Sequence, residues 1–367
     1  MRRNLIDRLE PRTLCSVSFA TPLRTELADV PTDLAIGDLN GDGRPDLVAT
    51  DKLEKFYVLL NEGGRFDRTR LDRIHALRVE LGDFNDDGFA DLVTMGRESL
   101  TVRLGTGDGR FARARTYLMP SAPLDVEVAD FDGDGRRDLA AASLARGVVT
   151  VLFGRGDGTF GGRTEIKVAG RPAAVHATDL DGDDKADLIA VRRKAGKATV
   201  FMSGAARGFV PTAILVAEPP AWDVVSGDFN GDDRTDLVLA YEDGLKVYLG
   251  RGDGTFDEGP AVREYDELTD VVAADFDGDD TLDLAVTSKK FGFAVLTGLG
   301  DGRFTHVFKR EVSWYFEWFE DEKEFMPAIV PRAEAADFDG DGLPDLALQA
   351  RILLGEGGVS LYRNQSV

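Results

Sequence analysis

Short apolar runs of strand length recur along the whole chain, separated by polar, glycine-rich connections. In each recurring unit a first run alternates apolar and polar residues, as in 125–129 and 270–274. A second run is almost continuously apolar, as in 187–191 and 236–240, which is typical of a strand buried on both faces. A third run lies at 55–60, 100–104, 148–153, 198–202, 245–249, 293–296 and 351–354.

Glycine turns and a looser fourth run complete each unit. The sequence Gly-Asp-Gly precedes an aromatic residue after several of the third runs, and Asp-Gly between apolar runs favours a hairpin. A fourth strand is expected, for example at 164–168 or 213–216. No segment carries a sustained helical period with capping residues. The pattern therefore predicts four-stranded antiparallel sheets.

An acidic nonapeptide separates the first and second runs of every unit. Its seven copies begin at residues 38, 83, 130, 179, 228, 275 and 337, with spacings of 45 to 49 residues except for the last, which is 62. Periods of this size indicate repeated supersecondary units. Seven such sheets predict an all-β fold, a seven-bladed β-propeller of four-stranded antiparallel blades.

The two ends of the chain predict how the ring closes. Residues 19–28 align with the turn aromatic and fourth strand of a unit, yet they precede the first acidic loop. We expect the propeller to span 19–367, with 1–18 as a targeting-like or flexible segment. The last unit is expected to form three strands within 333–354, and Thr21–Leu27 to complete that blade. In the alternative assignment, Val359–Arg363 fills the same edge.

Composition limits the partners and the environment. The formal charge of −22 disfavours nucleic acid and anionic membranes, because both would be repelled. No apolar run is long enough to cross a membrane, and the single Cys15 forms no internal disulfide. Seven divalent cations would offset more than half of the net charge. A monomer without membrane insertion is expected.

The acidic loops match the way calcium is wrapped by oxygen ligands. Side-chain oxygens at positions 1, 3, 5 and 9 and a backbone carbonyl at position 7 suit this hard cation. Position 12 lacks the Glu of an EF-hand. Up to seven structural Ca²⁺ ions are expected. Their ligands would be Asp38, Asn40, Asp42, Arg44 and Asp46; Asp83, Asn85, Asp87, Phe89 and Asp91; Asp130, Asp132, Asp134, Arg136 and Asp138; Asp179, Asp181, Asp183, Lys185 and Asp187; Asp228, Asn230, Asp232, Arg234 and Asp236; Asp275, Asp277, Asp279, Thr281 and Asp283; and Asp337, Asp339, Asp341, Leu343 and Asp345.

Position 6 of each loop is expected to need a positive φ. Glycine meets this need in four copies, for example at Gly135. Asp184, Asp233 and Asp280 occupy the same position in the other three, and some strain is expected there.

These repeats resemble the FG-GAP or VCBS repeats of the integrin α-subunit propeller over roughly residues 19–363. The resemblance implies that each acidic loop joins the first two strands of a blade and holds calcium on the lower face, whereas the upper face binds ligands. Separately, Leu9–Cys15 resembles the LEPR-XLL segment of large bacterial surface proteins, notably in planctomycetes, with Cys15 in place of the final Leu. This second resemblance implies export to the bacterial surface.

Two features are candidates for recognition. The long last spacing contains an aromatic insertion with Trp314, Tyr315, Phe316, Trp318 and Phe319, which would serve as a partner or sugar platform or fold back to plug the rim. The innermost strands also place charged residues on one side. These would grip a polar ligand or, in the favoured interpretation, form interblade salt bridges and strand-end hydrogen bonds; they are Asp33, Arg78, Glu80, Asp125, Glu127, His176, Asp223, Asp270, Arg332 and Glu334.

Three classes of function fit these features. The leading one is a non-enzymatic, calcium-stabilised extracellular propeller that recognises or adheres to a protein or glycan. The second is a carbohydrate-binding lectin, since some lectins have seven blades of this repeat. The third is a polysaccharide lyase, in which Glu80, Glu127, Glu334 and His176 would provide acid–base chemistry. With three histidines and no nucleophile motif, the enzyme is the least favoured.

Overall fold

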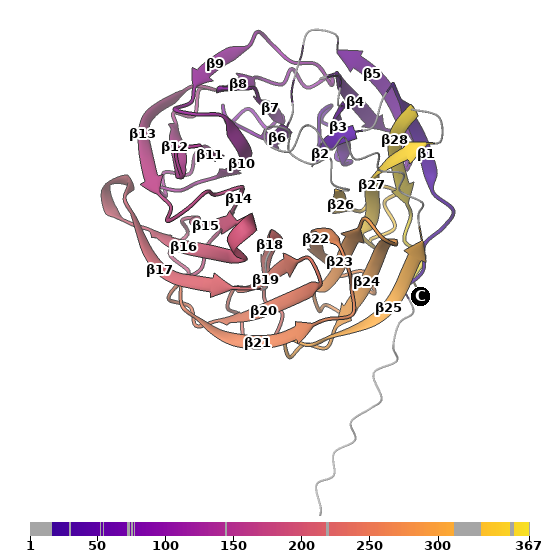
Figure 1. The fold of residues 1–367 in the computed structure, drawn as a ribbon. Helices are drawn as coiled ribbons and strands as arrows, with labels where there is room; N and C mark the ends of the chain where they lie inside the picture. Colours follow the sequence, from indigo (N-terminus) through magenta and orange to yellow (C-terminus); the bar gives the residue numbers. More distant parts are fainter. Residues whose placement is uncertain are drawn as a thin grey trace, which may run out of the picture.

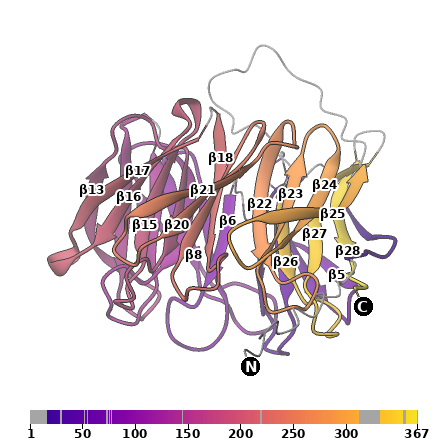
Figure 2. The same cartoon turned by 90° about the horizontal axis from the view of Figure 1, so that it is seen from below.

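The fold is a ring of seven four-stranded antiparallel sheets around a central axis, as predicted (Figure 1). The computed structural model describes residues 17–366, apart from 29–30, 52, 54, 72–73, 75, 77, 144, 218–219, 312–331 and 353–355. In each sheet the strand order follows the sequence from the axis outwards, except in the sheet that contains both ends of the chain. Figure 2 shows the resulting disk from its side.

The strands have the following bounds, with the innermost strand of each blade first. They are β2 Pro31–Gly37, β3 Asp46–Asp51, β4 Phe56–Asn61 and β5 Phe66–Leu71; β6 Arg78–Gly82, β7 Asp91–Met95, β8 Ser99–Arg103 and β9 Arg115–Leu118; β10 Pro123–Ala129, β11 Asp138–Ser143, β12 Val148–Gly154 and β13 Phe160–Lys167; β14 Ala174–Thr178, β15 Asp187–Arg192, β16 Lys197–Ser203 and β17 Phe209–Val216; β18 Ala221–Gly227, β19 Asp236–Tyr241, β20 Gly244–Gly250 and β21 Phe256–Val262; β22 Leu268–Ala274, β23 Asp283–Ser288, β24 Gly292–Gly298 and β25 Phe304–Glu311; and β26 Ala333–Ala336, β27 Asp345–Ile352, β28 Glu356–Tyr362 and β1 Leu23–Leu27.

The burial of each strand follows its hydrophobic pattern. Every residue of β11 is buried, as expected for a strand covered on both faces by neighbouring blades. The outermost strand of the same blade, β13, alternates and leaves about half of its residues exposed. Two short 3₁₀ turns, η1 Arg193–Ala195 and η2 Ala205–Arg207, are the helical segments of the described residues. No helix in this part of the chain is long and apolar enough to cross a membrane.

The last blade confirms the predicted closure and corrects its inner strands. The N-terminal β1 pairs antiparallel with β28, from Leu23 opposite Leu361 to Leu27 opposite Gly357, so it forms the fourth strand. The expected third strand at 351–354 is wrong, because β27 continues to Ile352 and the third strand is β28. The alternative that placed Val359–Arg363 at the outer edge is wrong for the same reason.

An aromatic contact between blades repeats around the ring. In five of the seven acidic loops the second residue is a buried phenylalanine that meets the turn aromatic of the next blade edge to face, as in Phe84 with Phe160 at 5.4 Å between ring centroids. Leu39 and Leu180 occupy this position in the other two loops. Phe338 of the last blade meets Phe66 of the first at 5.6 Å. Phe276 meets Phe19 at 6.4 Å, so Phe19 supplies the turn aromatic of the last blade. The apolar core therefore lies between blades.

Candidate functional site

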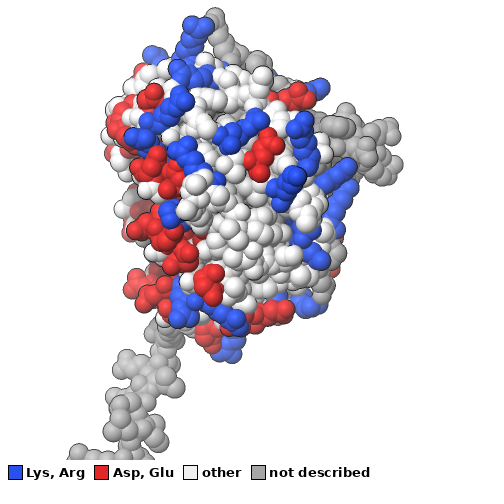
Figure 3. All heavy atoms as spheres, turned by 90° about the vertical axis from the view of Figure 1, so that its left-hand side faces the viewer, with Lys and Arg blue, Asp and Glu red and all other residues white. Residues whose placement is uncertain are grey.

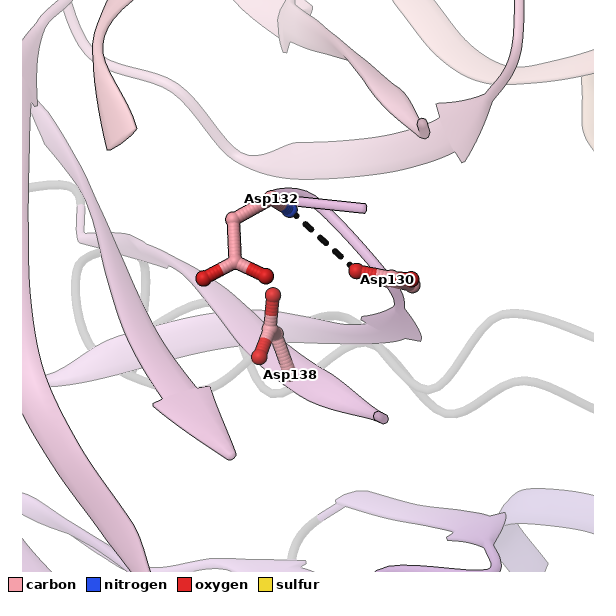
Figure 4. Close-up of side chains that lie close together, drawn as sticks. All are labelled: Asp130, Asp132 and Asp138. Carbon is pink, nitrogen blue, oxygen red and sulfur yellow. Dashed lines mark hydrogen bonds between the residues drawn. The ribbon is translucent and has the colours of Figure 1, made fainter. Parts of the chain in front are cut away.

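The acidic loops lie at one edge of the disk. Each joins the first and second strands of a blade, and antiparallel pairing places these loops on the same edge as the third-to-fourth turns. In Figure 4 the carboxylates of Asp130, Asp132 and Asp138 face a common centre. Among the described residues, four loops each bring three carboxylate oxygens within 4.8 Å of one another. These sets are Asp130, Asp132 and Asp138; Asp179, Asp181 and Asp187; Asp275, Asp277 and Asp279; and Asp337, Asp339 and Asp345.

The first Asp of each loop shapes the turn. Asp130 Oδ1 accepts hydrogen bonds from the backbone N–H groups of Asp132 at 3.3 Å and Gly133 at 2.8 Å. Its Oδ2 accepts one from Gly135 at 2.7 Å. The chain must turn sharply for this, and Gly135 has φ of 81°. Asp184, Asp233 and Asp280 adopt the same positive φ of 63° to 65°, as predicted.

The Asp at position 5 of each loop accepts the hydrogen bond that closes a second small turn. Its Oδ1 accepts a hydrogen bond from the backbone of position 7, as in Asp134 with Arg136 at 3.1 Å. In three loops the position-7 side chain also pairs with this Asp: Arg44 with Asp42 at 2.6 Å, Arg136 with Asp134 at 3.5 Å, and Lys185 with Asp183. In these three loops the position-5 carboxylate therefore faces the position-7 side chain. Among the position-5 residues of the described loops, only Asp279 joins a group of three carboxylates.

The Asp at position 9 of each loop has a structural role that the sequence analysis missed. Asp138 is fully buried, and its two oxygens accept hydrogen bonds from the N–H of Phe131 at 2.9 Å and of Gly154 at 2.7 Å. The same two bonds, to position 2 and to the end of the third strand, recur in all seven blades. Burial raises the pKa of Asp138 to about 7, although the two hydrogen bonds oppose this. A bound cation would act in the same direction as those bonds.

The loops fit a hard cation by their donors. The Oδ1 atoms of Asn230 and Asp339, both at position 3, are buried and accept no hydrogen bond. A buried oxygen without a donor is costly unless a ligand takes its place. Oxygen donors alone, on a loop closed by glycine, suit Ca²⁺. A bound ion would neutralise the clustered carboxylates. The residues at positions 1, 3 and 9 would hold it in three loops, and those at positions 1, 3 and 5 in the loop that begins at Asp275.

The ring of charges on the innermost strands joins neighbouring blades, which supports the favoured interpretation. Asp33 of β2 accepts a hydrogen bond from the N–H of Val79 on β6 at 2.9 Å. Equivalent bonds join Asp125 to Val175 at 3.0 Å and Asp270 to Ala333 at 2.8 Å.

Arginines at the corresponding positions of two other blades complete the ring. The guanidinium groups of Arg78 and Arg332 each lie 3.3 Å from Asp33, which is 1% exposed. Arg332 also lies 3.7 Å from Asp125. These ion pairs cross blade boundaries at the centre of the disk.

Four further groups of this ring have pKa values shifted from those of free side chains. Burial raises the pKa values of Glu80 and Glu127, and nearby carboxylates add to the effect. Burial raises the pKa of Glu334 to about 8, against the charge of Arg332. Burial lowers the pKa of His176, which lies 2.9 Å from the Ser226 hydroxyl. Burial of these three carboxyl groups near the axis therefore favours their protonated forms.

The charged side chains separate towards the two edges of the disk. Figure 3 shows Asp and Glu gathered along one edge, and Lys and Arg more frequent towards the other. The exposed Arg146, Arg171 and Lys194 lie in second-to-third or fourth-to-first connections, opposite the acidic loops. The predicted platform of Trp314, Tyr315, Phe316, Trp318 and Phe319 and the segment Leu9–Cys15 lie outside the described residues.

The fold and the repeated loops define a β-propeller built from acidic-loop repeats. Models of the FG-GAP-like repeat match residues 83–141, 130–190 and 208–286, and a model of the FG-GAP repeat matches 30–58. Together these matches cover more than half of the chain. The chain belongs to the FG-GAP repeat family, as the sequence analysis predicted.

Solved structures share the fold at low sequence identity. A lectin of Agrocybe aegerita that recognises non-reducing terminal N-acetylglucosamine is 22% identical, with a TM-score of 0.57 over 79% of this chain and 81% of the lectin. BBS1N, solved in complex with ARL6DN, is 12% identical, with a TM-score of 0.64 over 95% and 97% of the two chains. A Lactobacillus plantarum protein is 14% identical, with a TM-score of 0.61 over 77% and 85%. No curated protein sequence matches the chain.

Proposed function

We propose that the protein is a calcium-stabilised, non-enzymatic propeller that recognises a glycan or a protein outside a bacterial cell. The observation that carries the proposal is the acidic loop that occurs seven times at one edge of the disk, with three carboxylate oxygens close together in four of the copies. If calcium stabilises the blades at the edge with the acidic loops, the connections at the opposite edge are available to bind a partner. The protein would act as a monomer at the cell surface.

Calcium would act on stability in this proposal. A site saturated at ten times its dissociation constant adds about 1.4 kcal/mol to the free energy of unfolding. Several such sites would be large against a typical total of about 5–15 kcal/mol. Thermal unfolding in about 10 mM calcium, in about 10 mM magnesium and with excess chelator tests this. A concentration of about 10 mM is at least tenfold above the dissociation constants of about 0.1–1 mM that are typical of extracellular calcium modules. A melting temperature that is the same in all three conditions would refute a structural role for calcium.

A glycan partner is supported by the lectin that shares the fold, and a protein partner by BBS1N, which was solved in complex with ARL6DN. The glycan is tested first. The proposed ligand surface is the edge opposite the acidic loops. Binding of the calcium-loaded protein to a glycan array tests this directly. Trp314→Ala and Trp318→Ala would report on the aromatic insertion, and binding that survives both places the sugar site elsewhere on the edge.

Three aspartates of the innermost strands support a structural over a catalytic assignment. Asp33, Asp125 and Asp270 are each bonded to the backbone of the next blade, and His176 is near Ser226. Groups committed to such contacts are poorly placed to exchange protons with a substrate. Cleavage of a polysaccharide that is lost in Glu127→Gln would contradict the proposal and favour a lyase.

A further inference from the structure

Arg207 of the fourth blade contacts the acidic loop of the third blade. It lies in η2, the turn between the third and fourth strands, at the edge of the disk that carries the acidic loops. Its Nε–H donates a hydrogen bond to Asp132 Oδ2 at 2.7 Å. Its guanidinium carbon lies 4.3 Å from the ring centroid of Phe153, and its backbone carbonyl accepts a hydrogen bond from the Thr164 hydroxyl at 3.1 Å. One residue thus contacts the loop, the third strand and the fourth strand of the neighbouring blade.

The turn that carries Arg207 departs from the repeat. Four corresponding turns contain Gly-Asp-Gly, for example at 154–160, whereas residues 204–209 read Gly-Ala-Ala-Arg-Gly-Phe. Ala206 and Arg207 adopt positive φ values of 57° and 62°, which are unfavourable for residues with a side chain. The contact with Asp132 therefore follows from this variant turn and not from the repeated sequence.

Asp132 is one of the residues that would hold a calcium ion. It belongs with Asp130 and Asp138 to a group whose carboxylate oxygens lie within 4.8 Å of one another. In Figure 4 one oxygen of Asp132 faces Asp138, and the other points away. The same side chain, which is only 9% exposed, is the one that Arg207 contacts. The ion and the guanidinium group would therefore share one carboxylate.

Arg207 offsets part of the negative charge of this loop. Position 3 is Asp in the loop at Asp130, whereas it is Asn in the loops that begin at Asp38, Asp83 and Asp228, so the loop at Asp130 carries one more carboxylate. Arg207 pairs with that additional carboxylate. The affinity of a calcium loop depends on the charge of its ligands, and a fixed cation beside one ligand reduces the attraction for the ion.

We propose that Arg207 is a built-in counter-cation that weakens calcium binding at the loop of Asp130. At low calcium concentration it pairs with Asp132 and joins the third blade to the fourth. As the concentration rises, the ion meets a carboxylate whose charge is already partly neutralised, so this loop requires more calcium than it would without Arg207. The inference rests on the proposed calcium binding and deepens it, because it assigns a residue that sets the affinity of one site.

The test follows calcium binding at single loops in the full-length protein. The backbone N–H of Gly135 donates to Asp130 Oδ2 at 2.7 Å, and that of Gly43 makes the equivalent bond to Asp38 Oδ2 at 2.8 Å. The ¹H–¹⁵N NMR signals of the two glycines therefore report on two different loops. Gly135→Asp and Gly43→Asp assign the signals, since Asp occupies the same position in three other loops. Spectra at buffered concentrations of free calcium give the calcium midpoint of each loop.

Substitutions then separate the charge of Arg207 from its other contacts. Arg207→Gln should lower the calcium midpoint at Gly135 by about three- to tenfold, because a partly exposed charge has a modest effect even on a divalent ion. Arg207→Lys keeps the charge and should leave this midpoint within about twofold of that of the unchanged protein. Arg251→Gln is the matched control, because Arg251 lies in the turn of the next blade and pairs with Asp257 of its own blade at 3.0 Å. The control should leave the midpoints of both loops unchanged.

The results distinguish the role of Arg207 from calcium binding itself. A midpoint at Gly135 that is unchanged or higher in Arg207→Gln, or that falls equally in Arg207→Lys, overturns the counter-cation and leaves calcium binding standing. If neither glycine signal responds to calcium up to about 10 mM, both the counter-cation and the proposed calcium binding fail.

Discussion

Replacing Phe19 with alanine is expected to weaken the ring at the point where its two ends meet. The outermost strand of the last blade, β1, comes from the opposite end of the chain and pairs only with β28. Phe19 precedes this strand, and its backbone forms a bridge with Asn364. Its side chain is therefore the main apolar anchor beside a short edge strand.

The expected loss follows from the contacts of the ring. Phe19 is 9% exposed, and its centroid lies 5.2 Å from that of Phe308, 5.6 Å from that of Phe293 and 6.4 Å from that of Phe276. Truncating a buried phenylalanine costs about 3–5 kcal/mol of unfolding free energy. We expect a value near the lower limit, because a cavity close to a chain end collapses more easily than one in the centre of a blade.

Equilibrium unfolding in urea at saturating calcium measures this change. Ile214→Ala is the control, because Ile214 lies on the outer strand β17 with 59% of its surface exposed. The control should change stability by less than about 0.5 kcal/mol. In the Phe19→Ala variant, amide hydrogen exchange should increase more in β28 than in β11, relative to the unchanged protein. A Phe19→Ala protein as stable as the control would show that the terminal strand does not hold the ring closed.

Three further predictions concern the loops and the channel. Asp236→Ala should lower the free energy of unfolding by about 1–3 kcal/mol with or without calcium, because it leaves the N–H groups of Phe229 and Gly250 unpaired. Asn230→Ala should lower it only when calcium is present. Urea titrations with and without chelator separate the two effects. Asp33→Ala should cost about 3–5 kcal/mol in the same assay, because it leaves two arginines at the channel without their shared partner, and a loss below about 1 kcal/mol would contradict that role. Because Glu334 binds its proton more tightly in the folded than in the unfolded state, its pKa of about 8 predicts stability that falls from about pH 4.5 to about pH 8. Glu334→Gln should therefore raise the melting temperature more at pH 8.5 than at pH 5, and equal shifts at both pH values would refute the assignment.

The sequence predicted the fold because each blade repeats the same local signals. Continuous apolar runs such as β11, and the acidic loops before them, occur in every unit. A strand that is ambiguous in one unit can therefore be assigned by comparison with the other units. The last blade has no such check. Its third strand contains Gly357 and Gly358, which carry no hydrophobic pattern, so periodicity alone ended the blade too early. The pairing of β28 with β27 on one side and with β1 on the other shows that it is the third strand.

The candidate site was predicted less completely, for a physical reason. Oxygen spacing within a loop is a local property, and the convergence of Asp130, Asp132 and Asp138 agrees with it. The bond from Asp138 to Gly154 joins separate strands and needs the register of the sheet. The contacts of Arg193 and Lys289 with the ring of Trp222 require three blades at once. Arg193 and Lys289 lie in connections and Trp222 at the start of a strand, and no repeat pattern marks these three positions.

The two edges of the disk are therefore under different constraints. At the acidic edge, the ninth Asp of every loop is bonded to position 2 and to the third strand, so a change there disturbs the sheet itself. At the opposite edge, the exposed Arg146, Arg171 and Lys194 lie in the connections between strands. A substitution in these connections alters the binding surface without breaking a ladder or a loop. New specificity is thus easier to acquire at this opposite edge, and we expect recognition to vary there while the acidic loops stay the same.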